Sequence, residues 1–122
     1  MVLLTESRAF WLLTCWELEK KNGLYAFQPA LSAAQAPQMC RGAYAFIAGV
    51  TGAPPSTARE RTVLCGEIRA AAPGCKLLWL IEQPENHALI GPVTQAKRDG
   101  VIDQFLYAGV SPNYLAAVLD TL

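Results

Sequence analysis

Three short apolar runs limit what this chain can fold into. They are MVLL at residues 1–4, AYAFIAGV at 43–50 and CKLLWLI at 75–81. Apolar and polar residues do not alternate in these runs, which is typical of strands buried on both faces of a parallel sheet. Two further candidates, LYAF at 24–27 and VIDQFLY at 101–107, bring the predicted strands to five, with the last at or near an edge.

Helical segments fall between the predicted strands. Residues 8–22 form the first and end at Gly23, a common stop signal. Its predicted inward face consists of Ala9, Leu12, Leu13 and Trp16. Residues 57–72 form the third helix, for which Thr51, Ser56 and Thr57 are candidate caps or anion ligands, and we favour capping. The last helix has Ser111 as its N-cap, and its apolar stripe is Leu115, Val118, Leu119 and Leu122.

Prolines interrupt the other two helices. Pro37 lies inside the second candidate helix, and Gly91-Pro92 falls where a fourth helix would be running. Proline lacks the backbone N–H that an interior helical position needs, and its ring clashes with the preceding turn. We therefore expect a short fourth helix that begins close to Pro92 and ends at Asp99, with residues 82–91 mostly in a loop.

The order of elements predicts the fold class. Strand and helix alternate five times, which implies right-handed crossovers and helices on both faces of a parallel sheet. This is a flavodoxin-like, doubly wound α/β domain with strand order 2-1-3-4-5, and residues 1–122 form one such domain. A ligand site is expected beyond the C-terminal ends of the strands.

Composition excludes several classes of function. Ten basic and ten acidic residues cancel, so there is no electrostatic grip on nucleic acid or on an anionic membrane. No apolar run approaches a membrane span, and we expect a cytoplasmic protein. The cysteines at positions 15, 40, 65 and 75 form no CxxC pair, and His87 stands alone. We expect reduced, buried thiols and neither a metal nor a cofactor.

Several segments together resemble the receiver domain of bacterial two-component response regulators. FLYAGVSPNYLAAVLDTL, residues 105–122, is similar to the fifth strand and helix of that family, and EIRAAAPGCKLLWLIE, residues 67–82, to its third helix and fourth strand. MVLLTES resembles the opening strand, and AYAFIAGVTGAP the third strand with the loop that follows it. The likeness covers nearly the whole chain.

The resemblance also implies where the family's phosphorylation site would lie. Its positions read Thr5 and Glu6 for the magnesium-binding acids, Val50 for the phosphoacceptor aspartate, Ile81 for the hydroxyl residue, Ala108 for the lysine and Phe105 for the aromatic switch. Phosphoryl transfer needs an oxygen nucleophile and cations around the transferred group, and valine has no lone pair to offer. The resemblance therefore implies a degenerate receiver, or pseudo-receiver, that acts without phosphorylation.

Such a domain is a signalling module rather than an enzyme, and it works through protein contacts. In the family, the face made by the fourth helix, fifth strand and fifth helix commonly carries dimer or partner contacts. Here that face keeps Tyr107, Val110 and Tyr114, and the aromatic rings of the two tyrosines suit an interface. We expect a homodimer or a protein partner there, and an attached or separate DNA-binding module that the domain regulates in transcription.

Two other functions stay open at this level. One is a small-molecule sensor that uses an emptied apolar pocket around Val50, Ile81 and Ala108. The other is a small flavodoxin-like enzyme, which would require titratable groups clustered at the strand ends.

Overall fold

A parallel sheet forms the centre of the molecule. The computed structural model describes residues 1–22, 25–54, 56–82 and 87–122. The strands are β1 (Val2–Leu4), β2 (Gln28–Pro29), β3 (Ala45–Val50), β4 (Lys76–Ile81) and β5 (Gln104–Tyr107). Their order is β2-β1-β3-β4-β5 and every pairing is parallel, which confirms the predicted topology. The register sets Val50 beside Ile81, and Ile81 beside Tyr107.

The second strand, β2, lies later in the chain than the predicted strand at residues 24–27. Residue 24 is outside the described part. β2 pairs Gln28 and Pro29 with Val2 and Leu3. Phe27 is buried in the core, and its N–H donates to a Glu19 carboxylate oxygen at 2.8 Å. The Gln28 N–H donates to the Met1 carbonyl and the Ala30 N–H to the Leu3 carbonyl, both at 2.8 Å, which pairs this segment with β1.

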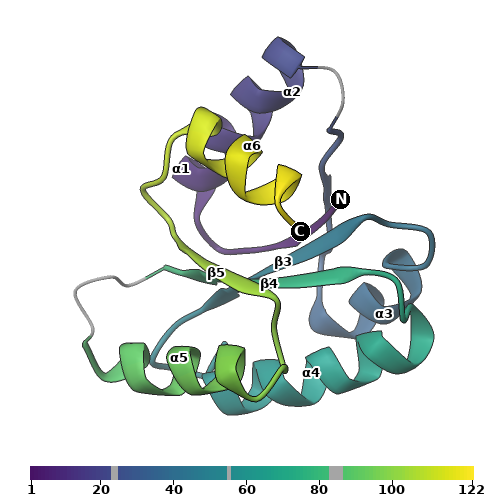
Figure 1. Ribbon diagram of the computed structural model, residues 1–122, viewed down its shortest axis with the longest axis vertical. Helices are drawn as coiled ribbons and strands as arrows, with labels where there is room; N and C mark the ends of the chain where they lie inside the picture. Colours follow the sequence, from purple (N-terminus) through teal and green to yellow (C-terminus); the bar gives the residue numbers. More distant parts are fainter. Residues whose placement is uncertain (23–24, 55, 83–86) are drawn as a thin grey trace.

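Helices cover the sheet in two layers (Figure 1). One layer holds α1 (Arg8–Phe10), a π-helical segment (Trp11–Cys15), α2 (Trp16–Asn22) and α6 (Pro112–Asp120). The other holds α3 (Ala36–Met39), α4 (Ala58–Ala71) and α5 (Ile90–Arg98). Each layer has its own buried core, with Phe46 and Trp79 in the core under α4, and Ile47 and Leu78 in the core under α6. No helix in the described ranges is long and apolar enough to cross a membrane.

The inward face of the first helical stretch is not the predicted one. Ala9, Leu12, Leu13 and Trp16 are all exposed, and the residues that face the core are Phe10, Thr14, Cys15 and Leu18. Residues 9–13 are all apolar, so the first turns are compatible with more than one inward face. A π-helical turn also inserts an extra residue per turn, which rotates the later side chains away from the regular helical spacing.

The fourth helix, α5, begins at Ile90, two residues before Pro92. A 3-10 turn over His87–Leu89 precedes it, so the predicted loop is wrong for residues 87–91, and residues 83–86 lie outside the described part. Proline is tolerated here because the first-turn N–H groups of a helix have no intrahelical partner. The same applies to Pro37, which lies at the start of the short α3.

Side-chain caps begin helices α4 and α6. Thr57 accepts from the Glu60 N–H at the start of α4, and Ser111 accepts from the Tyr114 N–H at the start of α6, each at 3.2 Å. In the last helix Leu115 and Leu119 are fully buried, while Val118 and Leu122 are half-buried against the same core.

Candidate functional site

Hydrocarbon side chains fill the C-terminal ends of β3 and β4. Val50 and Ile81 are adjacent in the sheet and are 0% and 1% exposed. The backbone N–H of Ala108 donates to the Ile81 carbonyl at 3.1 Å, which brings the third of these positions to the same edge. These three side chains offer no oxygen or nitrogen, and Val50 and Ile81 pack as core residues instead of lining an emptied pocket.

A carboxylate that the sequence pattern did not single out lies next to this edge. Glu82 directly follows β4, and its Oε1 accepts hydrogen bonds from the Thr5 hydroxyl, from the Glu6 N–H at 3.0 Å and from the Ser7 N–H at 3.0 Å. Ser7 is also the N-cap of α1. Glu82 therefore joins the end of β4 to the loop after β1, and it occupies backbone donors that could otherwise bind an anion.

The surroundings of Glu82 favour its neutral form. Burial raises the pKa of the Glu82 carboxyl, and the nearby Glu6 carboxylate raises it further. The N–H groups of Ser7 and Glu6 and the Arg61 guanidinium act in the opposite direction, but the net pKa shift is upward. Desolvation thus outweighs the hydrogen bonds at this site.

Arg61 of α4 places a buried cation below the same edge. Its side chain is 6% exposed; Nε donates to the Gly49 carbonyl and Nη2 to the Ser56 hydroxyl, both at 2.9 Å. Burial lowers the pKa of Arg61, with nearby Glu82 opposing the shift. Sequence analysis missed Arg61 because nothing in a helical ARER stretch marks one arginine as buried.

A cavity of about 500 Å³ opens between these groups and the segment after β2. Its polar lining includes Thr5, Glu6, Ser56, Arg61 and Glu82. Thr5 already donates to Glu82, and Glu6 is exposed. Among the residues that the structure describes, no group of three or more His, Cys, Asp or Glu side chains is placed to hold a metal ion.

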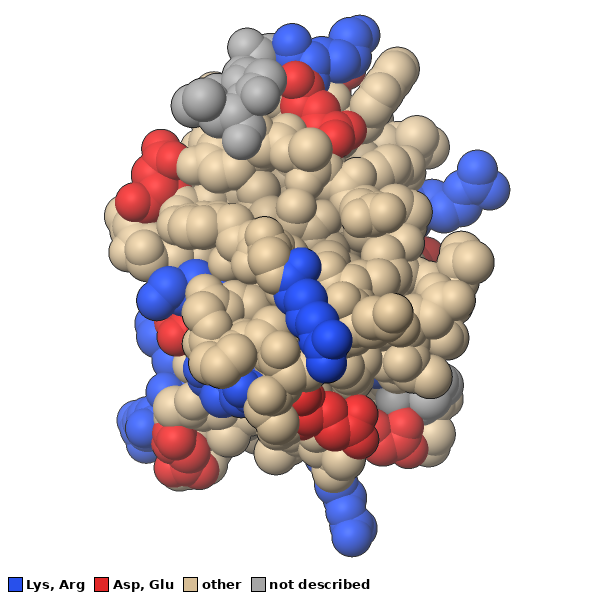
Figure 2. All heavy atoms as spheres, turned by 90° about the vertical axis from the view of Figure 1, so that its right-hand side faces the viewer, with Lys and Arg blue, Asp and Glu red and all other residues tan. Residues whose placement is uncertain are grey.

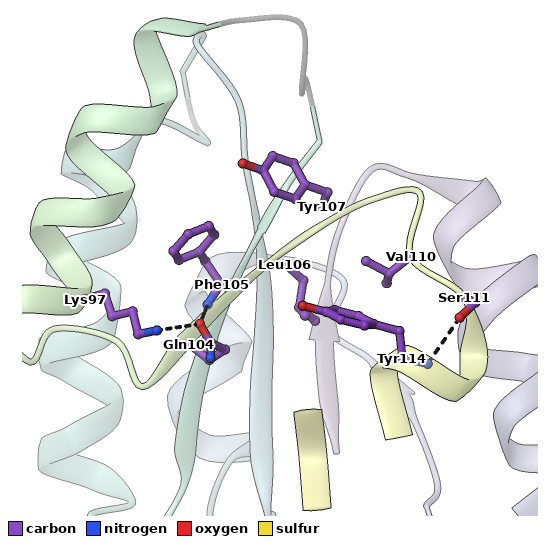
Figure 3. A pocket seen from close by; sticks show the side chains of 8 residues that line it. All are labelled: Lys97, Gln104, Phe105, Leu106, Tyr107, Val110, Ser111 and Tyr114. Carbon is purple, nitrogen blue, oxygen red and sulfur yellow. Dashed lines mark hydrogen bonds between the residues drawn. The ribbon is translucent and has the colours of Figure 1, made fainter. Parts of the chain in front are cut away.

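A second hollow lies on the face formed by α5, β5 and α6 (Figure 3). It measures about 540 Å³ and is lined by Lys97, Gln104, Phe105, Leu106, Tyr107, Val110, Ser111 and Tyr114. Tyr107 is 42% exposed and Tyr114 54%, while Val110 is half-buried. All three predicted interface residues therefore line one groove.

Contacts within the groove hold part of its wall in place. The rings of Phe105 and Tyr107 meet edge-to-face with centroids 6.2 Å apart. Lys97 Nζ lies 5.8 Å from the Phe105 ring centroid and donates to Gln104 Oε1 at 3.0 Å. Phe105, the predicted aromatic switch position, is half-buried and packs against the core under α4.

The charged side chains form no continuous patch of one sign on the face shown in Figure 2, where acidic and basic groups are interspersed with uncharged surface. This agrees with the balanced formal charge of the chain. The visible face therefore lacks the basic stripe that marks electrostatic binding of nucleic acid.

No protein-family model matches this sequence, and no curated protein matches it. Solved structures do match. A signal receiver domain of an HD domain-containing protein from Pseudomonas fluorescens Pf-5 superposes with a TM-score of 0.68 at 18% identity, over 98% of this chain and 82% of that one. The BeF3-activated DrrB receiver domain gives a TM-score of 0.65 at 12% identity, over 98% and 92%.

A response regulator from Burkholderia pseudomallei, solved with a phosphorylated aspartic acid, calcium ion and citrate, gives a TM-score of 0.61 at 18% identity. The match covers 97% of this chain and 64% of the regulator, so the chain spans less than two thirds of that protein's length. These likenesses show that the chain has the fold of response-regulator receiver domains.

Proposed function

We propose that this chain is a pseudo-receiver, a cytoplasmic signalling domain that acts through protein contacts and takes no phosphoryl group. The observation that carries the proposal is the side chain of Val50, which is fully buried at the end of β3, where the resemblance to receivers calls for the phosphoacceptor. A valine has no oxygen to form an acyl phosphate.

The neighbouring groups support the same proposal. A transferred phosphoryl group needs cationic partners, and Ile81 and Ala108 carry none. The buried cation, Arg61, donates to the Gly49 carbonyl and the Ser56 hydroxyl. Glu82 Oε1 accepts from the N–H groups of Glu6 and Ser7, so these donors of the loop after β1 are not free to bind a phosphoryl group.

The titratable groups around the cavity do not favour an enzyme. Arg61 and Glu82 do lie at the strand ends, but their hydrogen bonds go to backbone groups and to the hydroxyls of Ser56 and Thr5. The bonds of Arg61 join α4 to β3 and to Ser56, and those of Glu82 join the end of β4 to the loop after β1. Both groups therefore act as structural ties.

The groove of α5, β5 and α6 is the proposed docking face. Tyr107 and Tyr114 are large, amphipathic and partly exposed, which are the properties of residues that anchor interfaces. We propose that the face binds a second copy of this chain. The signal would then pass to an attached or separate module, such as a DNA-binding domain that controls transcription.

The loss of phosphorylation can be tested by mass. The protein is incubated with acetyl phosphate and magnesium, beside a receiver domain that retains its aspartate. We expect the intact mass of this protein to stay unchanged while the reference domain gains one phosphoryl group. A stable gain of one phosphoryl group by this protein would reject the proposal.

The docking face can be tested by sedimentation over a range of protein concentrations. Tyr114→Asp places a charge in the groove and is expected to weaken self-association. Val63→Asp is the matched control, because Val63 is an exposed apolar residue of α4, 61% accessible and outside the groove. A wild type that stays monomeric, or a Tyr114→Asp variant that associates normally, would reject the homodimer.

A further inference from the structure

Two cysteines meet at the end of the sheet opposite the site described above. Cys40 is the C-cap residue of α3, and Cys75 directly precedes β4. They are 0% and 3% exposed and belong to the same buried cluster. Both line the same surface cavity, and each thiol lies close enough to the other to shift its pKa.

Backbone hydrogen bonds hold the two cysteine segments together. The Lys76 N–H donates to the Tyr44 carbonyl at 3.0 Å, which ties the start of β4 to the turn after α3. Each cysteine is also part of a local turn: Ala43 N–H donates to the Cys40 carbonyl, and Cys75 N–H to the Ala72 carbonyl, both at 3.0 Å. Backbone hydrogen bonds in both segments therefore hold the two cysteines near one another.

The two sulfurs are unequal. The interaction with Cys40 lowers the pKa of Cys75, while the interaction with Cys75 and burial raise the pKa of Cys40. Cys75 is accordingly the thiol that ionises first. A thiolate beside a second thiol is the arrangement that disulfide formation requires.

A surface cavity reaches the pair. It measures about 370 Å³, and both cysteines line it together with Arg41, Gly42, Ala43 and Gly74. The low exposure of both residues keeps bulky reagents away, and the cavity is the side from which a small oxidant would approach.

We propose that Cys40 and Cys75 form a dithiol site that hydrogen peroxide oxidises to a disulfide. The Cys75 thiolate attacks one peroxide oxygen, the O–O bond breaks, and hydroxide leaves to give a sulfenic acid on Cys75. Cys40 then attacks that sulfur, the S–O bond breaks, and the proton of Cys40 leaves with the hydroxyl as water. Overall, two thiols are oxidised, one peroxide is reduced to two waters, and α3 becomes linked to β4.

The remaining cysteines serve as internal controls. Cys65 lies in the same core, but its sulfur accepts a hydrogen bond from the Trp79 indole N–H at 3.3 Å. Cys15 lies in the core layer on the other side of the sheet, where burial and Glu19 raise its pKa to about 12. Neither of them lines the cavity that Cys40 and Cys75 share.

The folded protein is treated with hydrogen peroxide, then denatured and alkylated, and its intact mass and peptides are measured. All four cysteines should be labelled before treatment. After it, Cys40 and Cys75 should escape labelling, their peptides should be joined, and dithiothreitol should restore full labelling. Cys15→Ser should behave like the wild type, while Cys40→Ala and Cys75→Ala should form no intramolecular disulfide.

Thermal unfolding of each variant shows whether it is folded. If both alanine variants fail to fold, the peptide map of the wild type still shows whether Cys40 and Cys75 are joined. Full labelling of the wild type after peroxide would overturn the proposal. So would a disulfide between another pair, or a sulfenic acid on Cys75 that never closes onto Cys40. None of these outcomes depends on whether the chain is a pseudo-receiver.

Discussion

The carboxylate of Glu82 lies directly over Gly49, in the space that a side chain at position 49 would occupy. A Cβ built on Gly49 would overlap the Cδ and both carboxylate oxygens of Glu82. Gly49 is the penultimate residue of β3, and its carbonyl accepts from Arg61. The missing side chain at position 49 therefore lets Glu82 reach across β3 to the loop after β1.

Gly49→Ala should displace Glu82 and destabilise the fold. The three hydrogen bonds to Glu82 Oε1 would be lost or strained, so we expect a loss of about 2–3 kcal/mol in the free energy of unfolding. Urea denaturation measures it. Gly66→Ala is the control: Gly66 is an exposed residue of α4 with open space around its Cα, and alanine there should add about 0.5–1 kcal/mol. Equal effects at the two positions would argue against the close approach of Glu82.

Glu82→Gln should change how stability depends on pH. The pKa of Glu82 is raised in the folded protein, so this group favours folding at low pH and that contribution is lost as the pH rises through the raised pKa. Glutamine keeps an Oε1 acceptor without the charge. The variant should therefore gain stability relative to the wild type as the pH rises from the ordinary glutamate pKa through the raised one, as measured by urea midpoints. A relative loss over that interval would mean that the N–H groups of Glu6 and Ser7 outweigh burial.

Val50→Asp tests how tightly the strand end is packed. An aspartate at this fully buried position would be an unpaired charge, and we expect a loss of about 3–5 kcal/mol at neutral pH. The loss should shrink on acidification, because burial would raise the pKa of the new carboxyl and it would become neutral. Val63→Asp, at an exposed position of α4, should cost no more than about 1 kcal/mol. A stable Val50→Asp variant would show that this strand end is open to solvent.

A matched pair of leucines tests the orientation of the first helical stretch. Leu18 is 3% exposed and Leu13 is 69% exposed. Leu18→Ala should cost about 2–4 kcal/mol through lost packing and a cavity. Leu13→Ala should stay within about 0.5 kcal/mol. Thermal or urea unfolding distinguishes them, and the reverse order would restore the inward face that the apolar spacing predicted.

The sequence was sufficient for features that local patterns control. Continuous apolar runs predicted the buried strands β1, β3 and β4, because strands covered on both faces have no polar side. Ser111 was recognised as a cap, and Thr57 was one of three candidates, since a cap depends on a few consecutive residues. The position of Val50 beside Ile81 followed from the order of parallel strands, whose C-terminal ends lie at one edge.

Features that depend on contacts between distant residues were decided only by the tertiary structure. The predicted inward face of residues 8–22 was wrong because residues 9–13 are all apolar and do not mark one side, and the residues that pack against the sheet include Phe10 and Leu18. Glu82 and the loop at residues 5–7 are more than seventy positions apart. Cys40 and Cys75 become neighbours only when β4 aligns with the turn after α3. Burial, hydrogen-bond partners and pKa shifts belong to such juxtapositions, and no short stretch of sequence contains them.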